Sequence, residues 1–97
     1  MNVSDLKPRC SVEKIELTVM DIEEPRGFFS KSGVKSNMCS AVARDNEGKR
    51  VGVTLLNNEI EKVRTNDRII ITNGWVKEWY GQLEISTGKF GSLEVLK

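Results

Sequence analysis

Both tryptophans of this 97-residue chain and its only tyrosine lie in one short segment, GWVKEWYGQLEI, which begins at Gly74. Aromatic rings in such a cluster either fill a core or offer flat faces to a ligand. Nucleic-acid bases suit the second role, because stacking contributes roughly 1–3 kcal/mol per base and every base has a face to stack. The role of Trp75, Trp79 and Tyr80 therefore depends on whether other residues already supply the core.

A second segment concentrates positive charge. From Pro25 to Arg44 the chain contains no acidic residue, whereas Arg26, Lys31 and Lys35 are basic, as is Arg44 itself. The net charge of the whole chain is only +1, which argues against a strong general binder of polyanions. The segment is thus either a solvated loop or one cationic wall of a binding site.

Length and composition indicate one compact domain over residues 1–97, with the first few residues flexible. The 38% hydrophobic and 30% charged content is typical of a globular chain. No apolar run is long enough to cross a bilayer and the N-terminus lacks a hydrophobic signal core, so we expect a cytoplasmic protein with no membrane partner.

Chemistry that needs metal ligands or catalytic groups finds little support in the sequence. The chain has no histidine, and Cys10 and Cys39 lie far apart with no C-x-x-C motif, which excludes the usual zinc patterns. No paired carboxylates, phosphate loop or nucleophile motif is evident. We therefore expect a non-enzymatic protein with no catalytic residues, no metal and no cofactor.

Alternating apolar residues predict five strands, over residues 12–22, 38–45, 50–56, 68–75 and 82–86. Their inward positions are Ile15, Leu17, Val19, Cys39, Ala41, Ala43, Val51, Val53, Leu55, Leu83 and Ile85. Residues 25–37 predict a long mobile loop, residues 44–50 a tight turn and residues 57–67 a short helical turn. The segment between the fourth and fifth of these strands is expected to form an aromatic loop, and residues 91–96 can add a last short strand.

Five strands with a single helix between the third and fourth favour an all-β, five-stranded Greek-key OB barrel over another small barrel or a sandwich. In the OB fold, the loop between strands one and two and the loop between strands four and five border one groove. The outer face of strands two and three forms the floor of that groove. The basic segment and the tryptophan segment are therefore predicted to become neighbours.

None of the six aromatic residues occupies a predicted inward strand position. They are Phe28, Phe29, Trp75, Trp79, Tyr80 and Phe90, of which Tyr80 or Phe90 could cap a barrel end. Large rings outside a core are costly to expose unless a partner covers them. A groove with aromatic faces and cations suits single-stranded nucleic acid, because a duplex hides the faces of its bases.

An ordered series of short motifs supports this interpretation over nearly the whole chain. It comprises DLKP near the start, D-x-x-G at Asp45 and Gly48, VTLL ending at Leu56, NGW ending at Trp75, and YGQLEISTGK from Tyr80. In this series the chain resembles the single-OB-fold single-stranded-DNA-binding proteins of archaea, which are similar to the DNA-binding domains of replication protein A. The resemblance implies a role in protecting single strands during replication, repair or recombination.

The resemblance also implies three stacking positions, of which Trp75 and Trp79 match two and Leu56 replaces the third aromatic. The full predicted site consists of Trp75 and Trp79 as stacking anchors, Phe28 or Phe29 as a contact from the first loop, Arg26, Lys31, Lys35, Lys77 and Lys89 near phosphates, and Arg44 and Leu56 on the groove floor. The expected ligand is single-stranded DNA, bound with little sequence preference. Two alternatives remain open: an RNA-binding OB domain, and a protein-interaction subunit of a replication-protein-A-like complex with replication or repair partners.

Overall fold

Seven strands and two short helices follow one another along the described part of the computed structural model. The structure describes residues 2–29, 33, 35–88 and 91–96, and for Arg26, Phe28, Phe29 and Trp79 it describes the backbone alone. The strands are β1 (Ser11–Ile22), β2 (Arg26–Phe29), β3 (Lys35–Arg44), β4 (Arg50–Leu56), β5 (Arg68–Trp79), β6 (Gln82–Ser86) and β7 (Ser92–Leu96). The 3-10 helix η1 (Val3–Asp5) precedes β1, and the helix α1 (Asn58–Lys62) lies between β4 and β5.

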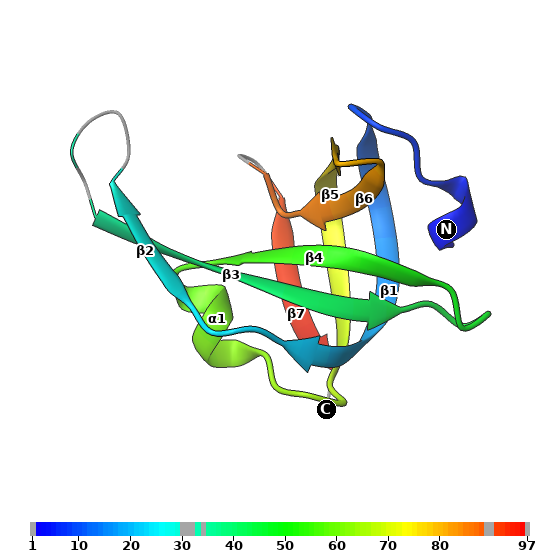
Figure 1. Cartoon of the computed structure of the whole chain (residues 1–97). Helices are drawn as coiled ribbons and strands as arrows, with labels where there is room; N and C mark the ends of the chain where they lie inside the picture. Colours follow the sequence, from blue (N-terminus) through cyan, green and yellow to red (C-terminus); the bar gives the residue numbers. More distant parts are fainter. Residues whose placement is uncertain (1, 30–32, 34, 89–90, 97) are drawn as a thin grey trace.

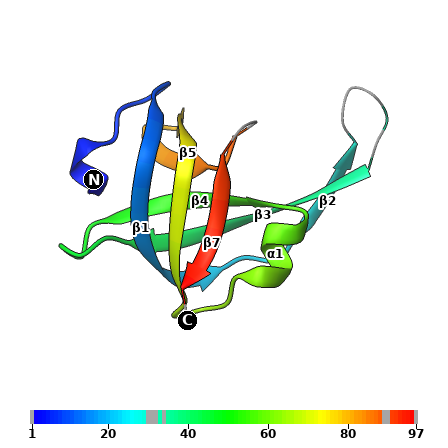
Figure 2. The same cartoon turned by 180° about the vertical axis from the view of Figure 1, so that it is seen from behind.

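Five of these strands close into a ring (Figure 1). β1 pairs with β3, β3 with β4, β6 with β5 and β5 with β1, all antiparallel, while β4 and β6 pair in parallel. β7 adds to the free edge of β5, and α1 joins the third and fourth strands of the ring. Figure 2 shows β1, β5 and β7 side by side on the back of the barrel. The predicted five-stranded OB fold with one short helix is confirmed.

The core is aliphatic, as the alternation predicted. Ten of the eleven predicted inward positions are buried, and Leu83 is half-buried and packs against the others. Val12, Ile69, Ile71 and Val76 complete the centre. Among the described side chains, the buried hydrophobic residues include no aromatic ring, whereas Trp75 is 42% exposed and Tyr80 is 91% exposed. Trp75 and Tyr80 are therefore not needed to fill the barrel.

The predicted long loop over residues 25–37 is wrong in its secondary structure. β2 pairs antiparallel with the first half of β3, from Arg26 opposite Met38 to Phe29 opposite Lys35. The two strands form an arm that projects beyond the ring (Figure 1). Neither Lys35 nor Asn37 packs on the core, since both are exposed. The arm thus lacks the alternation of apolar and polar residues that marks a half-buried strand.

The predicted aromatic loop after the fourth strand is also wrong, because that segment is part of a hairpin. β5 continues to Trp79, which pairs with Gln82 on β6. Tyr80 and Gly81 form the turn with φ angles of 49° and 77°, the left-handed pair that a two-residue hairpin of type I′ requires. The chain therefore reverses direction directly after Trp79.

The alternation along β5 is interrupted at Asn73. This residue has a left-handed φ of 52°, and asparagine tolerates that conformation better than most residues. After Ile71 the buried positions are Gly74 and Val76 rather than residues 73 and 75. The interruption turns Trp75 to the outside of the barrel. It also explains why the predicted strand ended at Trp75, whereas β5 continues to Trp79.

Asp45 ties the N-terminal segment to the turn between β3 and β4. Its side chain is buried, and Oδ1 accepts hydrogen bonds from the backbone N–H groups of Glu47 and Lys49, both at 2.9 Å. Oδ2 accepts from the N–H of Val3, also at 2.9 Å. This turn was predicted from the Asp-Asn-x-Gly sequence, and the contact with η1 adds a second role to the same carboxylate.

The ionisation of Asp45 should contribute to stability. Burial by itself raises the pKa of this carboxyl, but the N–H groups of Val3, Lys49 and Glu47 and the charge of Lys49 outweigh that effect and hold the pKa below the usual value of an aspartate. A carboxyl whose pKa is lower in the folded state stabilises the fold above its unfolded pKa. That contribution is lost as the pH falls through the lowered value.

The Asp45→Asn variant tests this contribution. Asparagine keeps one acceptor oxygen for the turn but turns an NH₂ group toward the N–H of Val3. We expect a Tm several degrees lower at neutral pH, and a difference from the native chain that shrinks below a pH of about 4. Thermal unfolding followed by circular dichroism across this range measures it. Asp21→Asn, at an exposed position, is the control, and equal Tm values for Asp45→Asn and the native chain at neutral pH would refute the assignment.

Candidate nucleic-acid interface

The outer side of β3 and β4 forms a continuous surface, which we name the β3–β4 face. Its cross-strand pairs are Met38 with Leu56, Ser40 with Thr54, Val42 with Gly52, and Arg44 with Arg50. The inward partners on both strands are buried in the core, so these side chains alternate to the outside. The face is apolar at one end, small in the middle and cationic at the β3–β4 turn.

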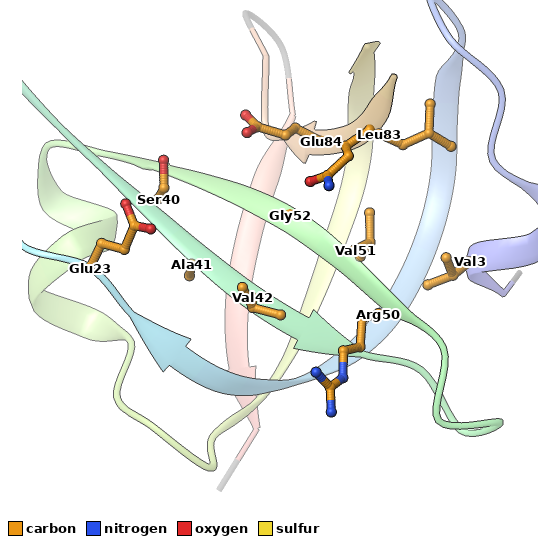
Figure 3. A pocket seen from close by; sticks show the side chains of 11 residues that line it. Val3, Glu23, Ser40, Ala41, Val42, Arg50, Val51, Gly52, Leu83 and Glu84 are labelled. Atoms are coloured by element: carbon orange, nitrogen blue, oxygen red, sulfur yellow. The ribbon is translucent and has the colours of Figure 1, made fainter. Parts of the chain in front are cut away.

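A groove of about 640 Å³ lies on this face beside β6. Its lining residues are Val3, Glu23, Ser40, Ala41, Val42, Arg50, Val51, Gly52, Gln82, Leu83 and Glu84. Figure 3 shows β6 with Glu84 on one side of the groove and Ser40, Val42 and Arg50 on the strands that form its floor. This surface, which we name the β3–β4 groove, coincides with the floor predicted for an OB barrel.

Trp75 and Lys77 lie on β5, which is separated from the groove floor on β4 by the strand β6. On β5, Trp75 pairs with Ser86 and Lys77 with Glu84, and Glu84 in turn pairs with Gly52 on β4. Trp75 and Lys77 are exposed, whereas Val76 between them is buried. The outer side of β5 therefore continues the surface that begins on β3 and β4.

The arm borders the same face at its apolar end. Met38, which pairs with Leu56 on one side, pairs with Arg26 on the other. Lys35 is exposed near the end of the arm. Figure 1 shows the arm projecting to one side while the β5–β6 hairpin lies above the middle of β4. The two segments therefore flank the β3–β4 face from different directions, rather than lying side by side as predicted (Figure 1).

The predicted site residues are placed unevenly. Arg44 is exposed and Leu56 half-buried, at opposite ends of the β3–β4 face rather than in the groove itself. Phe28 and Phe29 lie on β2, and Trp79 lies at the end of β5. For these three residues the structure describes the backbone only. Lys31 and Lys89 fall outside the described residues.

Sequence reasoning missed several groove residues, above all Arg50, Val42, Glu23 and Glu84. Arg50 could have been predicted to face outward, because it lies two residues before Gly52 and six before Leu56 on the same strand, and both of those were predicted to face outward. Arg50 stands directly opposite Arg44. Like charges in this position destabilise a sheet, so the pair favours an anionic partner at this end of the face.

The backbone of Glu23 is fixed beside the groove by two hydrogen bonds with β3. Its N–H donates to the carbonyl oxygen of Ser40 at 2.8 Å, and the Sγ of Cys39 donates to the carbonyl oxygen of Glu23 at 2.7 Å. Burial, and then the nearby charge of Glu23, raise the pKa of the Cys39 thiol. Cys39 therefore stays protonated at neutral pH and acts as a structural donor.

Among the described residues, no helix has the length and apolar character needed to cross a membrane. No protein-family model matches the chain. A curated protein, the single-stranded DNA binding protein Ssb of Saccharolobus solfataricus, is 27% identical over 86 residues, which are 89% of this chain and 57% of that protein. The chain thus spans little more than half the length of this relative.

Solved structures show the same architecture over the whole chain. The second OB-fold domain of replication protein A from Methanococcus maripaludis superposes with a TM-score of 0.79 at 26% identity, covering 100% of this chain and 94% of that one. A replication Factor A related protein from Methanobacterium thermoautotrophicum superposes with a TM-score of 0.80 at 20% identity, covering 99% and 89% respectively. The second likeness supports the fold alone.

Proposed function

We propose that this OB-fold domain, which is related to the archaeal single-stranded-DNA-binding and replication-protein-A-related proteins, binds single-stranded DNA in replication, repair or recombination. The observation that carries the proposal is the position of Trp75. Trp75 is 42% exposed on β5, one strand away from the β3–β4 groove, although an aliphatic core already fills the barrel. An exposed indole next to cations and an open groove is an arrangement that stacks unpaired bases.

In this proposal the bases stack on Trp75 and Trp79, and Phe28 or Phe29 adds a contact from the arm. Phosphates lie near cations around the face, namely Arg26, Lys31, Lys35, Arg44, Arg50, Lys77 and Lys89. Leu56 and Met38 offer an apolar contact where the archaeal family has an aromatic ring. The domain acts by binding alone, with no catalytic step, and shows at most modest sequence preference.

A second candidate is a protein-binding role within a replication-protein-A-like complex. The apolar Met38–Leu56 pair at one end of the face and the net charge of only +1 favour it. Single-stranded RNA offers the same stacking faces as DNA, so oligo-U belongs in every binding test beside oligo-dT.

The salt dependence of oligo-dT binding tests the proposal. If about four cations displace counterions from a single strand, the logarithm of the binding constant falls with log salt at a slope near −3. Affinity should then drop by about 50-fold between roughly 50 and 200 mM salt. Fluorescence anisotropy of a labelled oligo-dT measures the slope.

Lys77→Ala should flatten this slope by about 0.7, since one phosphate contact is lost from a single strand. Lys14→Ala removes an equal charge from an exposed position on β1, outside the groove, and should leave the slope unchanged. Failure of oligo-dT and oligo-U to bind even at low salt would contradict the proposal and favour the protein-binding role.

A further inference from the structure

The β3–β4 groove carries a carboxylate on its β6 side (Figure 3). Glu84 is half-buried on β6, and its Oε2 accepts a hydrogen bond from the Oγ1 of Thr54 at 3.1 Å. Thr54 is itself buried, with only 6% of its surface exposed. The hydrogen bond holds one oxygen of Glu84 toward the floor, and within the described part of the chain the other oxygen accepts no hydrogen bond.

Gly52 makes room for this arrangement. A Cβ atom at Gly52 would lie 2.9 Å from the Cγ of Glu84 and 3.5 Å from the carbonyl oxygen of Leu83. The stem of Glu84 therefore passes across β4 where the strand has no side chain. The carboxylate rests in the groove because of the glycine beneath it and the hydroxyl beside it.

Glu84 stands opposite Lys77 of β5, and the two side chains form no ion pair within 4.0 Å. Within the described part of the chain, the one ion pair closer than 4.0 Å joins Arg68 and Glu16, far from the groove. Arg50 lines the same groove but extends away from β6 in Figure 3. Glu23 adds a second carboxylate to the lining. The described lining of a groove proposed for a polyanion thus holds two carboxylates, Glu84 and Glu23, beside the cation Arg50.

This charge restricts how a single strand can lie in the groove. A phosphate near Glu84 meets electrostatic repulsion, whereas the exposed Lys77 and Arg44 lie outside the lining of the groove. The phosphates are therefore favoured at the rim and the base edges toward the floor. An ionised carboxylate only accepts hydrogen bonds, so it favours an edge that donates.

The four bases differ in whether they offer an exocyclic hydrogen-bond donor to such a carboxylate. Cytosine, adenine and guanine each carry an exocyclic amino group that donates, while thymine presents the O4 acceptor in place of the amino group of cytosine. Glutamate is a known type of acceptor for the N4 amino group of cytosine. Thymine places an acceptor oxygen against the negative oxygen of Glu84, which is unfavourable.

We propose that Glu84 is a specificity-determining residue that accepts a hydrogen bond from the exocyclic amino group of a base in the β3–β4 groove. The proposal rests on single-stranded-DNA binding as the function of the domain. It gives the domain a modest preference for cytosine over thymine, two pyrimidines of similar size. Thr54 is a positioning residue that acts through Glu84.

The test compares the affinities of oligo-dC and oligo-dT of equal length near neutral pH by fluorescence anisotropy. The native chain should bind oligo-dC about fivefold more tightly. Glu84→Gln should bring the ratio close to one by weakening oligo-dC and strengthening oligo-dT, because an amide both donates and accepts. Glu94→Gln makes the same change of charge at an exposed position on β7 and should keep the native ratio.

Two results would overturn the proposal while leaving single-strand binding intact. One is equal affinity of the native chain for oligo-dC and oligo-dT. The other is a Glu84→Gln variant that binds both more tightly by the same factor, which is the signature of a merely repulsive charge. If neither oligonucleotide binds the native chain, the proposed function fails together with the inference.

Thr54 supplies a second test that leaves the charge in place. Thr54→Val removes the hydroxyl that holds Glu84, and the oligo-dC to oligo-dT ratio should fall toward one. Thr54→Ser restores a hydroxyl and should restore the ratio, which a purely structural role of the side chain would not require. A native ratio in Thr54→Val would show that this hydrogen bond does not position the carboxylate.

Discussion

Replacing Trp75 with alanine should weaken oligo-dT binding by roughly 1–3 kcal/mol and change the thermal stability little. Trp75 is 42% exposed and lies on the outer side of β5, so removal of its side chain should leave no cavity among the buried core residues. Stacking on a base is what the variant loses. Affinity from fluorescence anisotropy and Tm from circular dichroism separate the two effects. We expect a similar loss of affinity for Trp79→Ala.

The neighbouring residue provides the matched control. Val76 is fully buried on the inner side of the same strand, so Val76→Ala should lower the free energy of unfolding by roughly 2 kcal/mol. Its affinity for oligo-dT per folded molecule should stay close to that of the native chain. If instead Trp75→Ala is destabilised as much as Val76→Ala and retains full affinity, Trp75 is a packing residue and the groove has another use.

The ring strands could be predicted where one face is buried and the other is solvated. Ile15, Leu17 and Val19 on β1, and Val51, Val53 and Leu55 on β4, alternate without interruption, and all six are buried. This pattern is the direct consequence of a pleated strand on a core. The tight turn at Asp45 and Gly48 followed from residues that favour turn conformations.

The arm and the end of β5 could not be predicted in the same way. Lys35 and Asn37 on the arm are both exposed, so no period marks the strand. On β5 the left-handed Asn73 shifts the inward positions to Gly74 and Val76, so a strict two-residue period ends at Ile71. In both places pairing with a neighbouring strand, rather than a hydrophobic face, specifies the extended backbone.

The composition of the groove depends on contacts between distant strands. Trp75 was identified from the aromatic cluster and Leu56 through the resemblance, and Arg50 shares the outward parity of Gly52. Glu84 is different, because its place in the groove follows from the parallel pairing of β4 with β6 and from the open space at Gly52. Nothing in the local sequence around Glu84 specifies that pairing.

The largest difference we expect is between single-stranded and duplex DNA. In a duplex the bases are stacked on one another and cannot reach Trp75 or Trp79, so two stacking contacts of at least about 1 kcal/mol each are lost. The cations around the β3–β4 face still attract phosphates, so weak, salt-sensitive duplex binding should remain. Oligo-dT should therefore bind about 30-fold or more tightly than a hairpin duplex of equal length.

One anisotropy titration of the native chain at low salt, with labelled oligo-dT and the labelled hairpin duplex side by side, measures this ratio. Quenching of tryptophan fluorescence in the same samples reports whether the indoles meet the bases. We predict tight binding and quenching with oligo-dT and little of either with the duplex. Equal affinity for both, or binding of oligo-dT without quenching, would contradict base stacking on Trp75 and Trp79 as the basis of recognition.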